Sequence, residues 1–211
     1  MNTKKHLFYL LAVLLGGCLP VISLHPLFTK ENLVFEEKLL GTWVDDPNSP
    51  EVTWEFERIA EKKKAYKLIF SDDKGKKGLF VTHLVKLENR LFMDVYPAEL
   101  PWEQEDPNNL KWPYNAFFLI PAHTFIKVSS IEPQLKMRIT NGDEMEKLLK
   151  EDPNAVKHIS LEDRLVLTAS TKELQAFVLK YADDERVFTG EEIVLNRKKS
   201  KNPNSTSNIG P

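Results

Sequence analysis

The chain has 211 residues, of which 42% are hydrophobic and 28% are charged, and its formal net charge is −2. This length allows one domain with a sizeable core, and the lack of a basic surplus argues against nucleic acid as a partner. The chain contains one cysteine, Cys18, so an intramolecular disulfide is excluded.

Residues 1–17 have the pattern of a secretory signal peptide. Lys4 and Lys5 precede an almost unbroken apolar run from Leu7 to Leu15. The run is about half as long as the ~20 residues that a membrane-spanning helix needs. A buried core helix is the alternative, but the run lacks both an amphipathic period and an N-cap. We therefore expect residues 1–17 to direct export and to be removed.

Leu15-Gly16-Gly17-Cys18 resembles the lipobox of bacterial lipoproteins, in which an aliphatic residue and two small residues precede the modified cysteine. The resemblance implies cleavage between Gly17 and Cys18, a diacylglyceryl thioether on Cys18 and attachment of the mature chain to a membrane. Leu19 follows the cysteine, and by the same resemblance this favours the outer membrane, facing the periplasm, if the source is Gram-negative. Residues 18–38 are then expected to form the lipidated N-terminus and a short tether.

Alternation of apolar and polar residues runs from Val52 to Tyr96 and predicts antiparallel strands. Trp54 and Phe56 share one face of the first of these strands, and Leu68 and Phe70 share one face of the second. Residues 123–140 continue the pattern as two strands around a turn near 131–134.

Two helices are expected near the C-terminus. Asn141-Gly142-Asp143 precedes a helix that Pro153 ends, and Thr171 is the expected N-cap of a helix over 172–184. Residues 158–170 and 191–198 are expected to form further short strands. Residues 198–211 contain a single aliphatic residue, Ile209, and are expected to form a disordered tail.

Gly41-Thr42-Trp43 looks like the Gly-x-Trp signature in the first strand of lipocalins. The resemblance implies an eight-stranded barrel, with Trp43 plugging its closed end and Gly41 allowing close approach of the chain. Combined with Cys18, the signature also resembles bacterial lipocalins and lipocalin-like lipoproteins. The fold prediction is therefore mainly β: an antiparallel lipocalin-like barrel of about eight strands over 39–197, with two short helices near the C-terminus. An open antiparallel sheet backed by the second helix is the alternative.

The chain departs from the lipocalin pattern in three respects. It has a long insertion at 97–121, it has two helices instead of one, and the arginine of the family's later motif has two candidates, Arg186 and Arg197.

No catalytic signature is found. The histidines His25, His83, His123 and His158 lack the spacing of a zinc site, and neither a nucleophile elbow nor a phosphate-binding loop occurs. We expect no catalytic residue, no metal and no cofactor. His83, which alternates with Val81 and Val85, is expected to be partly buried.

The insertion at 97–121 contains an unusual number of aromatic residues. If links between strands alternate between the two barrel ends, this insertion lies at the end opposite Trp43. The candidate ligand-binding residues are Trp102, Trp112, Tyr114 and Phe117. The alternative is a lid that packs these rings onto the barrel permanently.

The sequence thus predicts an envelope lipoprotein that is anchored through Cys18 and is not an enzyme. It is expected to bind a small apolar or lipid-like ligand. The alternative is a structural or interaction lipoprotein that contacts another envelope protein through the 97–121 loop. Large inward residues on every strand favour the alternative, whereas small ones favour a ligand cavity.

Overall fold

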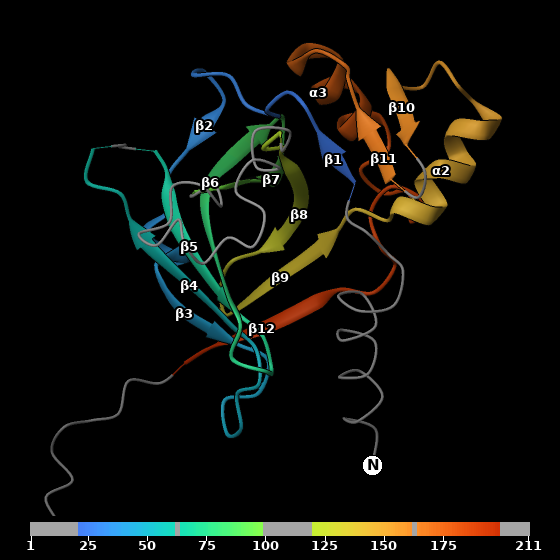
Figure 1. Ribbon diagram of the computed structural model, residues 1–211. Helices are drawn as coiled ribbons and strands as arrows, with labels where there is room; N and C mark the ends of the chain where they lie inside the picture. The colour runs from blue at the N-terminus through green and yellow to red at the C-terminus, as the bar shows by residue number, and fades with distance from the viewer. Residues whose placement is uncertain (1–20, 62–63, 99–119, 162–163, 199–211) are drawn as a thin grey trace, which may run out of the picture.

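The computed structural model describes residues 21–61, 64–98, 120–161 and 164–198 (Figure 1). Twelve strands, one 3-10 helix and two α-helices occur in these ranges. In chain order the elements are β1 (Ile22–Ser23), β2 (Leu33–Val34), η1 (Glu37–Leu39), β3 (Gly41–Val44), β4 (Thr53–Arg58), β5 (Tyr66–Ser71), β6 (Lys77–Leu87), β7 (Arg90–Pro97), β8 (Thr124–Ser130), β9 (Gln134–Ile139), α2 (Gly142–Glu151), β10 (His158–Leu161), β11 (Arg164–Leu167), α3 (Thr171–Lys180) and β12 (Ile193–Arg197).

Eight of the strands form a closed antiparallel barrel. Neighbours pair in the order β6, β5, β4, β3, β12, β9, β8 and β7, and β7 pairs with β6 to close the ring. β2 adds to the C-terminal half of β6, beyond the segment that pairs with β5. The prediction of a lipocalin-like barrel with two helices near the C-terminus is confirmed, and the open-sheet alternative is excluded because the β6–β7 pairing closes the ring.

The barrel interior is filled by large side chains. The register places one set of alternating residues on the inner face, and each barrel strand contributes at least one large buried side chain to a single hydrophobic cluster. From β3 to β12, in chain order, these include Trp43, Phe56, Leu68, Leu84, Met93, Ile126, Met137 and Leu195. Apolar and polar residues therefore alternate along these strands because one face of each strand is buried, as the sequence suggested.

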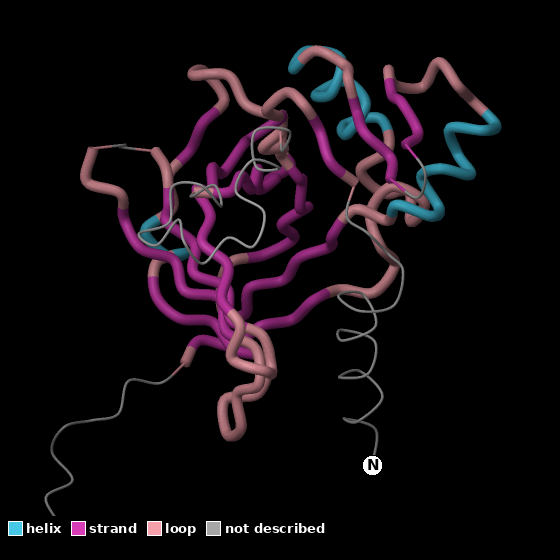
Figure 2. The backbone as a smooth tube through the Cα atoms, viewed as in Figure 1, coloured by secondary structure: helices cyan, strands magenta, loops and turns pink. Residues whose placement is uncertain are grey.

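A small α/β unit packs against the outside of the barrel. β1, β11 and β10 form a separate three-stranded sheet, in which β1 is parallel to β11, and α2 and α3 lie beside it (Figure 2). A second hydrophobic cluster joins helix residues such as Leu148 and Phe177 to outward-facing barrel residues such as Phe92 and Phe125. Both helices thus cover one wall of the barrel and leave its two ends to other segments.

An ion-pair cluster adds to this junction. Arg90 of β7 donates two hydrogen bonds to the carboxylate of Asp183, at 2.8 and 2.6 Å, and Lys127 of β8 donates a third at 2.8 Å. The hydrogen bonds from Arg90 and then from Lys127 hold the pKa of Asp183 below its usual value. Asp183 follows α3, so the cluster ties the end of that helix to the barrel wall.

Two local expectations are corrected. The N-cap of α3 is Ser170 rather than Thr171: Ser170 and Glu173 form a reciprocal capping box, while the hydroxyl of Thr171 donates to the carbonyl of Pro26 at 2.8 Å. The tether expected over 18–38 does not hold for its described part, because Val21, Ser23 and Leu27 are buried and β1 and β2 pair with other strands.

Helix α2 agrees with its prediction, since the side chain of Asn141 caps it by accepting from the backbone of Glu144. Within the described ranges, no helix has both the length and the apolar composition needed to cross a bilayer.

Candidate functional site

One end of the barrel, called here the Trp43 end, is closed by packed groups. Trp43 is fully buried, and its indole N–H donates to the carbonyl of Leu39 at 2.8 Å. The expectation that Trp43 lies buried at one end is therefore confirmed. η1 and the residues that precede it cover this end.

Arg197 completes the closure. Its guanidinium lies 4.3 Å from the centroid of the Trp43 ring, and Nη1 donates to the carbonyl of Leu40 at 2.8 Å. Gly41 has φ +109°, a conformation that favours glycine, and a Cβ there would lie only 3.0 Å from Arg197 Nη1. Of the two arginines that the sequence left open, Arg197 is therefore the one beside the signature. Arg186 instead pairs with Asp184 and Glu151.

Tyr66 fixes the segment that covers this end. Its hydroxyl accepts from the backbone N–H of Glu36 at 2.6 Å, and its ring stacks on Phe35 at 4.5 Å. Burial of the hydroxyl raises the pKa of Tyr66 to about 12, so the residue stays protonated across the physiological range. With Trp43, Arg197 and Tyr66 all engaged, this end offers no entrance among the described residues.

The opposite end, called here the far rim, has a different character. It is defined by the strand ends Val44, Thr53, Ser71, Lys77, Pro97, Thr124, Ile139 and Ile193. Figure 1 is seen from this side of the barrel. Trp54, Phe70 and Phe80 lie on the inner faces of three adjacent strands near this rim and are only partly buried.

The far-rim aromatic residues contact one another. The rings of Trp54 and Phe70 meet edge to face with centroids 5.4 Å apart. Gly78 leaves room for the ring of Phe80, because a Cβ at position 78 would lie 2.6 Å from that ring. The result is an apolar inner surface near the far rim, above the filled part of the interior.

The residues that the sequence singled out as sites lie outside the described ranges. Gly17 and Cys18 precede Val21, and Trp102, Trp112, Tyr114 and Phe117 fall within 99–119. The strand ends that flank the insertion, Pro97 and Thr124, do lie at the far rim, as the alternation of links predicts.

A buried carboxylate is the feature that sequence reasoning missed. Asp94 faces outward from β7, its side chain is fully buried, and its Oδ1 lies 2.6 Å from Nδ1 of His123. Its Oδ2 accepts from the backbone N–H of Leu27 at 2.7 Å. Asp94 therefore joins the barrel wall to the N-terminal segment and to the residue just before β8.

An imidazole held by a carboxylate is an arrangement that general acid–base chemistry uses. Here the imidazole of His123 also contacts the rings of Tyr96, at 4.6 Å, and Phe28, at 6.5 Å. The hydroxyl of Ser23 donates to the carbonyl of His25 and not to His123. Among the described residues, the pair therefore has the contacts of a structural link and lacks a nucleophile.

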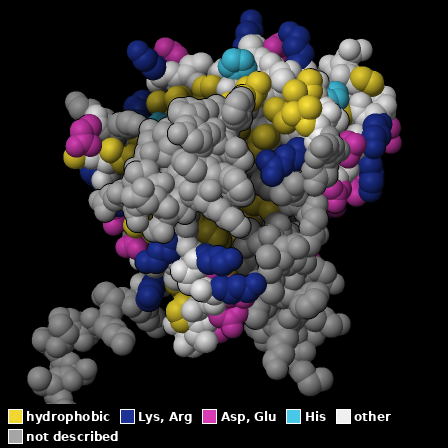
Figure 3. All heavy atoms as spheres, in the orientation of Figure 1, with side chains coloured by type: hydrophobic (Ala, Val, Ile, Leu, Met, Phe, Trp, Pro, Cys, Tyr) yellow, Lys and Arg dark blue, Asp and Glu magenta, His cyan; other side chains and the backbone are white. Residues whose placement is uncertain are grey.

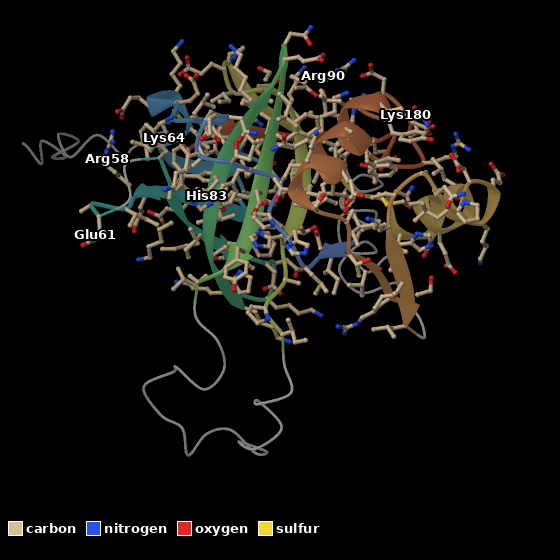
Figure 4. The ribbon with its side chains drawn as sticks, turned by 90° about the horizontal axis from the view of Figure 1, so that it is seen from above. Arg58, Glu61, Lys64, His83, Arg90 and Lys180 are labelled. Atoms are coloured by element: carbon tan, nitrogen blue, oxygen red, sulfur yellow. The ribbon has the colours of Figure 1, made fainter. Side chains whose placement is uncertain are left out.

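His83, opposite Asp94 on β6, is partly buried as expected, and its ring lies 4.2 Å from that of Phe28. Figure 4 labels it on the barrel wall. No group of three or more potential metal ligands occurs in the described part of the chain.

One signal could have pointed to the link. Asp94 interrupts the apolar run of "LFMDVYP", and an acid in such a strand needs a partner if it is buried. The identity of that partner was not readable, because His123 is 29 residues away and no short motif connects the two.

The chain was compared with protein-family models, with curated proteins and with solved structures, and none of the three comparisons found a match.

Proposed function

We propose that this chain is a lipid-anchored binding protein of the bacterial cell envelope, without catalytic activity, that takes an apolar or lipid-like ligand at the far rim. The observation that carries the proposal is the partly buried aromatic surface of Trp54, Phe70 and Phe80 above a closed interior. Aromatic rings provide large apolar contact area at low conformational cost.

The filled interior limits the kind of ligand. Large side chains from all eight strands occupy the middle of the barrel and the Trp43 end, so a ligand would contact the rim rather than enter deeply. Such a site suits one end of an acyl chain or a flat apolar group. Trp102, Trp112, Tyr114 and Phe117, in the segment that joins two far-rim strand ends, would add further contacts.

The membrane part of the proposal rests on the lipobox-like sequence at Leu15–Cys18. The mature chain would begin at Cys18 and carry acyl chains there. Two acyl chains are sufficient for stable membrane attachment. In a Gram-negative source, Leu19 favours the outer membrane, facing the periplasm.

The filled interior also favours a second candidate function, a structural or interaction lipoprotein that meets another envelope protein through the 97–121 loop. Native mass spectrometry of protein extracted from the envelope separates the two candidates. A co-purifying small molecule supports the ligand function, and a stoichiometric protein partner supports the interaction function.

Substituting Cys18 tests the anchor. Cys18→Ala removes the only thiol to which the lipid can be attached, so we expect the protein to leave the membrane fraction and to lack acyl mass. The measurement is fractionation followed by intact-mass analysis of wild type and variant. Mature wild-type protein without acyl mass would contradict the proposal.

Introducing a charge at the far rim tests the ligand site. Phe70→Glu places a carboxylate beside Trp54, and desolvating that charge on ligand binding should weaken affinity for a fluorescent fatty acid by about tenfold or more. The matched control is Val194→Glu, at an exposed position on β12, and it should bind like wild type.

The melting temperature of both variants is measured alongside binding, since Phe70 contributes to packing. Equal affinity of wild type and Phe70→Glu, or no binding by wild type, would exclude the far rim as the ligand site.

A further inference from the structure

The proposed lipid on Cys18 would hold the folded body very close to the membrane. Cys18 is three residues before Val21, where the described fold begins, and β1 starts at Ile22. Three residues span at most about 10 Å even when fully extended. The part of the fold that surrounds Val21 must therefore lie next to the lipid headgroups.

Val21 lies beside the far rim. Its carbonyl accepts a hydrogen bond of 3.0 Å from the hydroxyl of Thr124, the first residue of β8. Ser23 and His123 exchange two backbone hydrogen bonds of 2.8 and 2.9 Å. The chain thus enters the fold where the far-rim end of β8 begins.

The β10–β11 hairpin of the three-stranded sheet lies on the same side of the molecule as the far rim. Ile22 pairs with Val166 in parallel, and Leu161 pairs with Arg164 at the start of β11. The N-terminal end of β1 therefore lies at the β10–β11 hairpin end of this sheet. In Figure 4 that end and the far-rim strand ends lie on the same side of the molecule, opposite Arg90.

Exposed apolar side chains gather on this side. Five large hydrophobic residues in the described ranges are exposed. Ile159 (44%) and Leu161 (55%) lie on β10, and Ile120 (74%) leads into His123. Leu24 (42%) follows the opposite end of β1, and Val194 (37%) lies on β12. Figure 3 shows hydrophobic side chains over the small sheet on this face. Such grouping, unlike scattered single residues, indicates an interaction surface.

We propose that this surface, called here the anchor face and formed by Ile120, Ile159, Leu161 and the far rim, rests on the bilayer that holds Cys18. The inference rests on the proposed lipid anchor and deepens it. The occupant is a lipid surface because the short connection to Cys18 leaves no room for another protein beside Val21. The far rim then faces the lipid, so an acyl chain can reach Trp54 and Phe70 without crossing bulk water.

The turn between β5 and β6 adds a polar contact. Lys74, Lys76 and Lys77 are exposed there at the far rim, next to the exposed Asp73, and anionic headgroups attract basic side chains. In the sequence, two acidic residues, Glu162 and Asp163, follow Leu161. Acidic residues are not attracted to anionic headgroups, so on the hairpin side the anchor face is expected to contact lipid through its apolar side chains.

The test uses full-length lipidated protein on vesicles of phosphatidylcholine with a minor share of phosphatidylglycerol. Ile159→Cys and Leu161→Cys provide thiols for an environment-sensitive fluorophore, and Asn89→Cys is the matched control, in the exposed β6–β7 turn at the Trp43 end. Because lipidation consumes the thiol of Cys18, wild type takes up no label. A quencher attached to lipid headgroups should remove most of the emission from positions 159 and 161 and little from position 89.

The outcomes separate the two proposals. Labelling of wild type, or failure to float with vesicles, would refute the lipid anchor itself. Flotation of unlabelled wild type, together with equal quenching at 161 and 89, would overturn the anchor face alone. Protection of position 161 that depends on protein concentration instead of the lipid quencher would assign β10 to a second copy of the chain, and would also overturn the inference.

Discussion

Replacing Trp43 with alanine is expected to lower the free energy of unfolding by about 3–5 kcal/mol, the range for truncating a fully buried large aromatic residue. Trp43 has no exposed surface, its indole donates to Leu39, and Arg197 lies over its ring. The variant therefore loses packing, a hydrogen bond and a cation–π contact together.

A drop of this size corresponds to a melting temperature roughly 10 °C lower for a domain of this length. Thermal unfolding followed by circular dichroism is the measurement. Trp43→Phe separates the contributions: it keeps most of the packing and loses the indole hydrogen bond, so about 1 kcal/mol is expected. Val194→Ala, at an exposed site, should change stability by less than about 0.5 kcal/mol. A Trp43→Ala protein that melts like wild type would contradict the assigned role of Trp43.

The barrel was predictable because its cause is local. Trp54 alternates with polar neighbours along one strand and Leu68 along the next, and this periodicity reports burial of one face whatever the partner strand is. The role of Arg197, in contrast, could not be predicted from the local sequence. The sequence offered Arg186 and Arg197 equally, and only the register of β12 against β3, which places Arg197 opposite Trp43, distinguishes them.

The N-terminal segment was misread for a related reason. β1 has two residues, too few to display an alternation, and its partner β11 lies more than 140 residues away. Leu27 is buried, yet Pro26 and polar neighbours make the segment resemble a linker. Its order comes from tertiary contacts that no local pattern contains, and the far-rim site depends on strand register in the same way.

The strongest of those contacts leads to the second large expected effect. Asp94→Ala should lower the free energy of unfolding by about 3–5 kcal/mol, because it removes one partner of a buried pair and leaves polar groups without their acceptor. The backbone N–H of Leu27 and Nδ1 of His123 both lose the Asp94 carboxylate. Denaturant unfolding of wild type and variant measures the loss.

Hydrogen exchange at the amide of Leu27 distinguishes this role from general loss of packing. The segment is also held by Thr171, whose hydroxyl donates to Pro26, and by Gln175, whose amide donates to the carbonyl of Leu27 at 2.8 Å. These contacts involve carbonyl groups, so they cannot replace the acceptor for the Leu27 N–H. Asp94→Asn supplies the control: its amide oxygen can still accept from Leu27, so protection of that amide should largely return. If the Leu27 amide in Asp94→Ala exchanged as slowly as in wild type, Asp94 would not be what holds the N-terminal segment on the barrel.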